Sequence, residues 1–235
     1  FAQRQTASAF KPILYATAFE EGAMPCQYLD NEELVLTDYE NWSPQNYNHS
    51  VGGKYSIAAA LAKSMNIPTV NLFLQLPFKS LQSMWSNLGF SQALEYNPST
   101  ALGAATASLY EMAYAYASFA NGGTKVEPQI ISVIKNSKGE IIYKNEFLNS
   151  KEQILDENST ILLNAVLQKA IKEGTGRSLK NVYGVQLPLA GKTGTSQNYA
   201  DAWFVAYNPN LVMITRVGAS MPGIHFNNGA NGSGS

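Results

Sequence analysis

Three short clusters of polar residues carry groups that could perform acyl transfer. The first is Ser8 and Lys11, three residues apart at the start of an apolar stretch with helical spacing. Residues three apart share one helix face, so the hydroxyl and the amine would lie side by side. A serine becomes a nucleophile when a neighbouring base removes its proton, and a lysine with a lowered pKa can be that base. Because Ser-x-x-Lys is common by chance, the other clusters decide its meaning.

The second cluster is Ser64-Met65-Asn66, at a predicted junction between two helices. Ser and Asn are ordinary helix-cap residues, which gives this position a purely structural interpretation. In a cleft, the hydroxyl can instead relay a proton, and the carboxamide can hold a substrate amide or orient a lysine. Both interpretations stay open on these residues alone.

The third cluster is Gly191-Lys-Thr-Gly-Thr-Ser196, on a predicted strand. Alternate side chains on a strand face the same way, so Lys192 and Gly194 share one face, and Thr193 and Thr195 share the other. Gly194 would let a substrate backbone approach, and an edge strand can pair with an extended peptide. The ammonium and hydroxyls suit a carboxylate. The glycine spacing excludes a phosphate-binding loop, and no helix is predicted to follow.

Composition narrows the class of protein. The chain has 235 residues, 45% of them hydrophobic, which is enough for one core with a small satellite lobe. The net charge is −1 and no basic run occurs, which argues against nucleic acid as a partner. Cys26 is the single cysteine, and His49 and His225 have no ligand-spaced neighbours, so no metal site is expected. No signal peptide or membrane-spanning run is present, and the abrupt ends indicate an excised domain.

Periodicity predicts a fold of the α/β class, in its α+β form. A period of 3.6 residues predicts helices over 13–22, 56–66, 69–76, 80–88, 108–119 and 159–171. Alternation predicts a hairpin of 129–135 with 140–144, and strands over 185–195, 202–207 and 211–217. Residues 23–50 read as a long irregular loop, which we expect Trp42 to anchor in preference to a direct substrate contact. These elements predict a mainly antiparallel sheet flanked by helices, with a helical lobe.

In this order, the three clusters resemble the motif set of penicillin-binding proteins and serine β-lactamases. Longer segments are similar to penicillin-binding proteins in particular: Arg4–Pro12, Trp42–Tyr47, Glu111–Gly123, and Gly191–Ser196 followed by Asp201–Phe204. The last of these is most similar to the bifunctional class A branch. The resemblance covers nearly the whole chain and implies one transpeptidase domain over residues 1–235.

Three departures from the family pattern stand out. Thr6 and Ala7 replace the usual Pro-Gly before the serine, and Ala206 stands where glycine is common. The family's first strand and its last helix have no counterpart in this chain. We therefore expect a different turn into the first helix and an incomplete sheet, as in a truncated fragment.

The resemblance implies a serine D,D-transpeptidase of peptidoglycan that β-lactams acylate. Ser8 would form an acyl-enzyme from a D-Ala-D-Ala stem peptide, with Lys11 as the general base and Lys192 lowering its pKa. Ser64 would pass the proton to the leaving amine, and Asn66 would bind the substrate amide and orient Lys11. The remaining roles are substrate binding at Thr193, Gly194 and Thr195, where the two threonines would receive the terminal carboxylate, and an oxyanion hole at the backbone N–H groups of Ser8 and Thr195. The reaction implied in this way needs no metal or cofactor.

The same resemblance implies the partners and the place of action. The partners would be stem peptides, β-lactam antibiotics and a glycosyltransferase domain upstream in a parent chain. That parent would be anchored to the cytoplasmic membrane, with this domain in the periplasm or outside the cell. A serine β-lactamase, a D,D-carboxypeptidase and a non-catalytic β-lactam sensor are the alternatives. Among these, a β-lactamase also needs a deacylating base, for which the sequence offers no obvious carboxylate.

Overall fold

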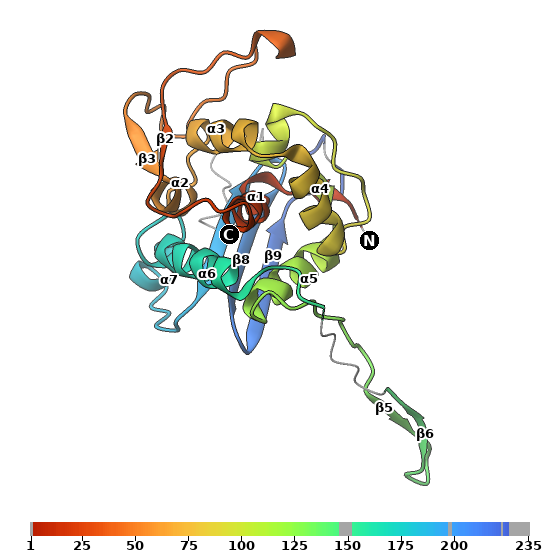
Figure 1. Cartoon of the computed structure of the whole chain (residues 1–235). Helices are drawn as coiled ribbons and strands as arrows, with labels where there is room; N and C mark the ends of the chain where they lie inside the picture. The colour runs from red at the N-terminus through yellow and green to blue at the C-terminus, as the bar shows by residue number, and fades with distance from the viewer. Residues whose placement is uncertain (1, 146–151, 197–198, 222, 226–235) are drawn as a thin grey trace.

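The computed structural model describes residues 2–145, 152–196, 199–221 and 223–225. It contains a three-stranded antiparallel sheet on which several helices pack (Figure 1). Its strands are β7 (Ala190–Thr195), β8 (Ala202–Asn208) and β9 (Leu211–Val217), in that order across the sheet. Both pairings are antiparallel and run without a register shift. Within the described residues β7 is an edge strand, as predicted, but it is shorter than the predicted range of 185–195.

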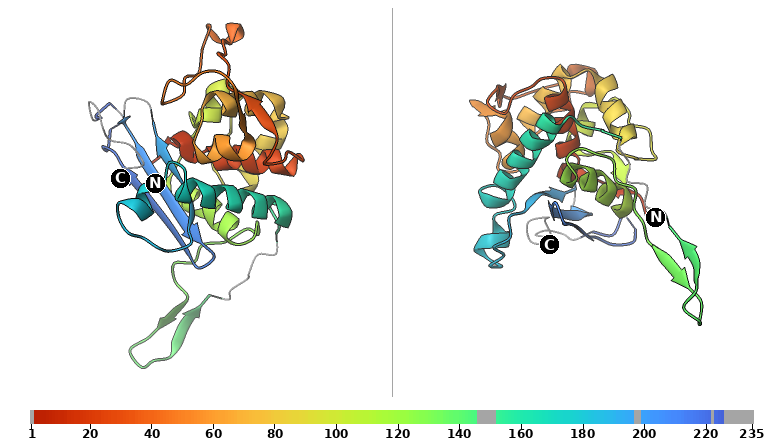
Figure 2. Two further views of the ribbon diagram at one scale, coloured as in Figure 1. Left: turned by 90° about the vertical axis from the view of Figure 1, so that its left-hand side faces the viewer. Right: turned by 60° about the horizontal axis from the view of Figure 1, so that its bottom comes forward.

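Helices pack on one face of this sheet and continue into a separate helical lobe (Figures 1 and 2). α6 packs on β7, and α5 packs on β8 and β9. The lobe of α2, α3 and α4 lies on the other side of α1. The helices are α1 (Lys11–Glu20), α2 (Ile57–Ala62), α3 (Ile67–Gln75), α4 (Phe78–Asn87), α5 (Leu109–Ala120), α6 (Glu157–Lys172) and α7 (Ser178–Asn181). The predicted layers of helices on an antiparallel sheet, with a helical lobe, are confirmed.

α1 is the central element of the core. Its residues 11–19 are all buried, so it lacks the polar face of a surface helix. It contacts α6 on one side and α2, α3 and α4 on the other. A helix enclosed in this way holds its first residue, Lys11, in a fixed position inside the protein.

Local signals in the sequence explain several helix ends. Ser108 and Glu111 form a reciprocal capping box at the start of α5, as predicted. Gly89, which follows α4, has a φ of +86°, a conformation that glycine adopts without steric cost. The predicted helix starts at Thr69 and Ser80 were two residues late, because Pro68 and Phe78 lie inside the first turns of α3 and α4.

Short elements complete the fold. β1 (Arg4–Gln5) pairs with β4 (Thr106–Ala107), and β2 (Tyr28–Asp30) pairs with β3 (Lys54–Ser56). Three 3₁₀ turns are present among the described residues: η1 (Ala7–Ala9), η2 (Thr37–Tyr39) and η3 (Pro98–Leu102). Since β2 and η2 lie within residues 23–50, the prediction of a wholly irregular segment there was wrong.

The predicted hairpin exists as β5 (Val133–Lys135) and β6 (Ile141–Lys144), and it projects from the body as an arm (Figure 1). All of its strand residues are exposed, so its alternating pattern marks no buried face. No helix in the described part of the chain is long and apolar enough to cross a membrane.

Candidate active site

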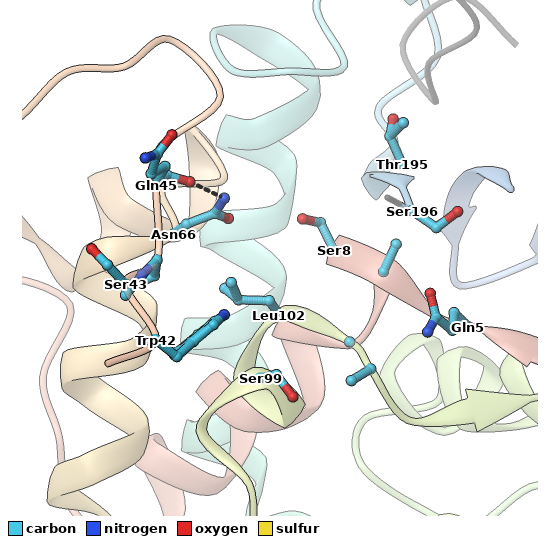
Figure 3. A pocket seen from close by; sticks show the side chains of 14 residues that line it. Gln5, Ser8, Trp42, Ser43, Gln45, Asn66, Ser99, Leu102, Thr195 and Ser196 are labelled. Atoms are coloured by element: carbon cyan, nitrogen blue, oxygen red, sulfur yellow. Dashed lines mark hydrogen bonds between the residues drawn. The ribbon is translucent and has the colours of Figure 1, made fainter. Parts of the chain in front are cut away.

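Ser8 lies in the 3₁₀ turn η1, directly before α1, whereas the helical spacing predicted Ser8 and Lys11 on one face of the helix itself. The turn is closed by hydrogen bonds from the Ala9 N–H to the Thr6 carbonyl, at 3.1 Å, and from the Phe10 N–H to the Ala7 carbonyl, at 3.0 Å. In a 3₁₀ turn, residues three apart eclipse one another, so Ser8 and Lys11 keep the same side. Ser8 is half-buried and lines a groove (Figure 3).

The departure at Ala7 places a residue with a side chain in a backbone conformation that favours glycine. Ala7 has a φ of +48°, in the left-handed region that costs a residue with a side chain about 1–2 kcal/mol. Gly103 packs against it, because a Cβ on Gly103 would lie 1.9 Å from the Ala7 carbonyl oxygen. The Ala7 N–H also donates to the Gly103 carbonyl at 3.0 Å. The turn into α1 therefore holds a strained alanine in place against η3.

The amine of Lys11 is completely enclosed below the groove. Its Nζ donates to the carbonyl oxygens of Ser64, at 2.9 Å, and Met65, at 3.1 Å, and to Oδ1 of Asn66, at 2.7 Å. The side chain has no exposed surface. All three residues of the second cluster, Ser64, Met65 and Asn66, therefore accept a hydrogen bond from the Lys11 amine. The contact with Asn66 is the one that the predicted orienting role requires.

Lys192, from the third cluster, contacts Ser64 of the second cluster. Its Nζ donates to Oγ of Ser64 at 2.8 Å and to its neighbour's carbonyl, that of Thr193, at 2.9 Å. Ser64 itself has a φ of +57°, a left-handed conformation at the end of α2 that turns the chain into α3. Ser64 therefore contacts both buried amines, Lys11 through its backbone carbonyl and Lys192 through its hydroxyl.

Burial controls the protonation of both lysines. Burial lowers the pKa of Lys192 to about 7. Burial, and then repulsion from the Lys192 ammonium, hold the pKa of Lys11 well below its usual range. A neutral amine is the form that can accept a proton, and burial favours that form for both lysines.

Gly194 has a different role from the one predicted. A Cβ at this position would lie 3.0 Å from the Ala9 nitrogen and 3.3 Å from the Thr6 carbonyl oxygen. The missing side chain therefore makes room for the protein's own turn η1, and Gly194 is not among the described residues that line the groove. Its effect is to bring β7 against the segment that carries Ser8.

The two threonines of the third cluster are placed differently. Thr195 lines the groove together with Ser8 (Figure 3). Thr193 is buried, and its hydroxyl donates to Oγ1 of Thr175 at 2.8 Å. Thr193 is not among the described residues that line the groove.

The groove has a volume of about 600 Å³ and runs past Ser8 between the helical lobe and the end of β7 (Figure 3). Of the predicted site residues, Ser8, Asn66 and Thr195 reach it, while Lys11, Ser64 and Lys192 lie beneath. The described residues that line it are all uncharged: Gln5, Ala7, Ser8, Trp42, Ser43, Pro44, Gln45, Asn66, Ser99, Leu102, Gly103, Ala104, Thr195 and Ser196. No carboxylate among them could serve as a deacylating base. In the part of the chain that is described, no group of three or more His, Cys, Asp or Glu could hold a metal ion.

Sequence reasoning missed several contributors to the site. Trp42 packs on the core, as expected of an anchor, but it also lines the groove. The Gln45 carbonyl accepts a hydrogen bond from Nδ2 of Asn66 at 2.7 Å. Thr175, in the segment Gly174-Thr-Gly176, accepts a hydrogen bond from the Thr193 hydroxyl. These contacts join distant segments through backbone or paired hydroxyl groups, so spacing within the sequence gives no signal for them.

Comparison with known proteins places this geometry in a family. The sequence model of the penicillin binding protein transpeptidase domain matches residues 2–221. Penicillin-binding protein 2D of Bacillus subtilis is 34% identical over 221 residues, which cover 89% of this chain and 31% of the relative. Other relatives are named penicillin-binding proteins 1A and 1B. The chain spans about a third of the length of these relatives.

Solved structures agree on the fold. Penicillin-binding protein 1A of Haemophilus influenzae matches with a TM-score of 0.91 at 23% identity, over 98% of this chain and 40% of that one. Penicillin-binding protein A of Mycobacterium tuberculosis, solved as an imipenem acyl-enzyme complex, matches with a TM-score of 0.77 at 21% identity, over 91% and 54% of the two chains. The family match extends over nearly all of the chain that carries the three clusters, and the resemblance seen in the sequence is confirmed. The chain belongs to the penicillin-binding protein transpeptidase domain family, with relatives of the class A type.

Proposed function

We propose that this domain is a serine D,D-transpeptidase that forms an acyl-enzyme on Ser8 from D-Ala-D-Ala stem peptides and passes the acyl group to an amine. The observation that carries the proposal is the chain of contacts from Lys11 through Asn66 and Ser64 to Lys192, directly beneath a groove that Ser8 lines. The groove is uncharged and open, which suits an extended peptide.

The reaction follows from these positions. Oγ of Ser8 attacks the carbonyl carbon of the penultimate D-alanine, and its proton passes to the neutral amine of Lys11. The backbone N–H groups of Ser8 and Thr195 stabilise the oxyanion, at about 3–4 kcal/mol per donor. The C–N bond then breaks, and Ser64 delivers a proton to the departing D-alanine. An acceptor amine attacks the ester, loses a proton to the same relay, and releases Ser8.

Lys192 serves this cycle in two ways. Its positive charge favours the neutral form of Lys11, and its Nζ donates a hydrogen bond that orients the Ser64 hydroxyl. Thr195, at the groove, is the residue of its strand that we propose for the substrate carboxylate. In the same proposal β-lactams acylate Ser8, just as imipenem forms an acyl-enzyme with penicillin-binding protein A of Mycobacterium tuberculosis.

The parent protein is part of the proposal. Class A relatives imply a glycosyltransferase domain before this one and a membrane anchor that places the domain outside the cytoplasmic membrane. The present chain would then be one domain of a longer enzyme. Stem peptides of peptidoglycan and β-lactams would be its ligands, and no cofactor enters the chemistry.

Two measurements with the 235-residue chain test the function. Incubation with a D-Ala-D-Ala peptide and an acceptor amine should release D-alanine and form the amide-linked product. Penicillin should give an adduct that persists for many minutes, because no carboxylate among the described residues lines the groove to activate water. Rapid turnover of penicillin would instead identify a β-lactamase. Release of D-alanine with no amide product would identify a carboxypeptidase, and a lasting adduct with no D-alanine release would identify a sensor.

A further inference from the structure

Asn46 is a buried asparagine outside the three clusters, in the loop that also contributes Trp42 and Gln45 to the groove. It is 2% exposed, and both ends of its carboxamide are fully bonded. Oδ1 accepts from the backbone N–H groups of Asn66, at 2.7 Å, and Ile67, at 3.2 Å. These are among the first N–H groups of α3, which have no partner within the helix. Asn46 therefore caps α3 from outside.

Asn66 occupies the position from which a helix is normally capped by its own side chain. Asparagine is among the preferred residues there. Yet Asn66 has backbone angles of φ −87° and ψ −52°, and its side chain makes no capping hydrogen bond. Its Oδ1 accepts from Nζ of Lys11 at 2.7 Å, and its Nδ2 donates to the Gln45 carbonyl at 2.7 Å. The Asn66 carboxamide can face the site because Asn46 caps α3 in its place.

A second buried carboxamide holds Asn46 in place. Nδ2 of Asn46 donates to Oδ1 of Asn31 and to the Ser50 carbonyl, both at 2.7 Å. Asn31 is 1% exposed, and its Nδ2 donates to the Gly52 carbonyl at 3.2 Å. A buried carboxamide is costly unless its hydrogen bonds are made, so a network that is complete at this depth fixes one orientation.

We propose that Asn46 is a positioning residue for acylation: by capping α3 in place of Asn66, it commits the Asn66 carboxamide to Lys11 and the groove. The inference rests on the proposed function of Ser8 and Lys11. Without Asn46, the first N–H groups of α3 lose their acceptor, and the side chain of Asn66 can turn to cap the helix instead of contacting Lys11. Lys11 then loses the acceptor at 2.7 Å, which is one of the three hydrogen bonds that fix the position of its amine.

The test measures the rate of Ser8 acylation by a fluorescent penicillin as a function of pH. Asn46→Ala should slow acylation by about ten- to a hundredfold, the scale of a misplaced catalytic group. The acidic limb of the pH profile should move to lower pH, because an oxygen acceptor favours the ammonium form of Lys11, and its loss lowers that pKa. Lys192, the charged group that acts on Lys11, is unchanged in this variant.

A double-variant cycle separates positioning from general destabilisation. If Asn46 acts through Asn66, the double variant Asn46→Ala with Asn66→Ala should be about as slow as Asn66→Ala alone. Asp156→Ala is the matched control, since it removes the side-chain cap of α6, whose acceptor bond to the Asn158 N–H is 2.8 Å long. It should lower stability and leave the rate and the pH profile unchanged. Asn46→Ser, with a shorter side chain, takes the place of Asn46→Ala in the cycle if the alanine variant does not fold.

Three results would overturn the inference: an unchanged rate in Asn46→Ala, a double variant slower by the product of both single effects, or an equal loss of rate in Asp156→Ala. A wild-type protein that penicillin does not label at all would instead contradict the proposed function. The two failures are therefore distinguishable in one set of measurements.

Discussion

Ser8→Ala is expected to abolish the covalent adduct with penicillin while the far-ultraviolet circular dichroism spectrum stays as in the wild type. The oxygen that would form the ester is lost, so no acyl-enzyme can form at this position. Within the described residues, the Ser8 hydroxyl forms no hydrogen bond, so its removal should cost little stability. The measurement is the intact mass of the protein before and after incubation with penicillin.

Ser83→Ala supplies the control for that experiment, because Ser83 is an exposed serine on α4. It should be acylated at the wild-type rate. An adduct on Ser8→Ala, at a rate near that of the wild type, would mean that the nucleophile has been assigned to the wrong residue.

Lys11→Met is expected to slow acylation by about a hundred- to ten-thousandfold, the usual contribution of a general base. Methionine has a similar length and no basic group, so the buried volume stays filled. The rate of labelling by fluorescent penicillin is the measurement. Lys79→Met, at an exposed position on α4, should keep the wild-type rate. A wild-type rate in Lys11→Met would assign the base to another group.

The same variant should also change how stability depends on pH. Lysines whose pKa is lowered in the folded state bind more protons when the chain unfolds, so the free energy of unfolding rises with pH. For Lys192 this window runs from about 7 to the ordinary 10.5, and Lys11 adds to the rise. Lys11→Met should therefore show a shallower rise, with Lys192 as the remaining source.

Urea denaturation between about pH 6 and pH 9.5 would measure this difference, since one pKa unit corresponds to about 1.4 kcal/mol. The range stops there because burial raises the pKa of Tyr15, Tyr116 and Tyr207, which makes stability fall again at higher pH. Equal slopes in the wild type and the variant would contradict the lowered pKa of Lys11.

Much of the site could be predicted because its chemistry is carried by short segments. Lys11, Ser64, Asn66 and Lys192 were identified from residue types and spacing, and the structure brings their side chains into one set of contacts. Their roles in catalysis remain proposals. Spacing could not show which group packs against Gly194. In the structure the backbone of η1 lies where a side chain at this position would be.

The fold shows the same division between local and non-local information. The start of α5 was predicted correctly because its capping box lies within four residues of sequence. The hairpin of β5 and β6 was also found, but period-two alternation could not show that both of its faces are exposed. The cap that Asn46 provides for α3 spans twenty residues and depends on tertiary packing, so no local pattern reveals it.

The central claim is that Ser8 is the residue acylated above the buried lysines, and peptide mapping of the penicillin adduct tests it most directly. Chymotryptic cleavage after Phe1 and Phe10 gives a peptide of residues 2–10, in which Ser8 is the single serine. We expect this peptide to carry the whole mass of penicillin, and fragmentation to place that mass on Ser8. A stoichiometric adduct on any other peptide, with residues 2–10 unmodified, would contradict the claim.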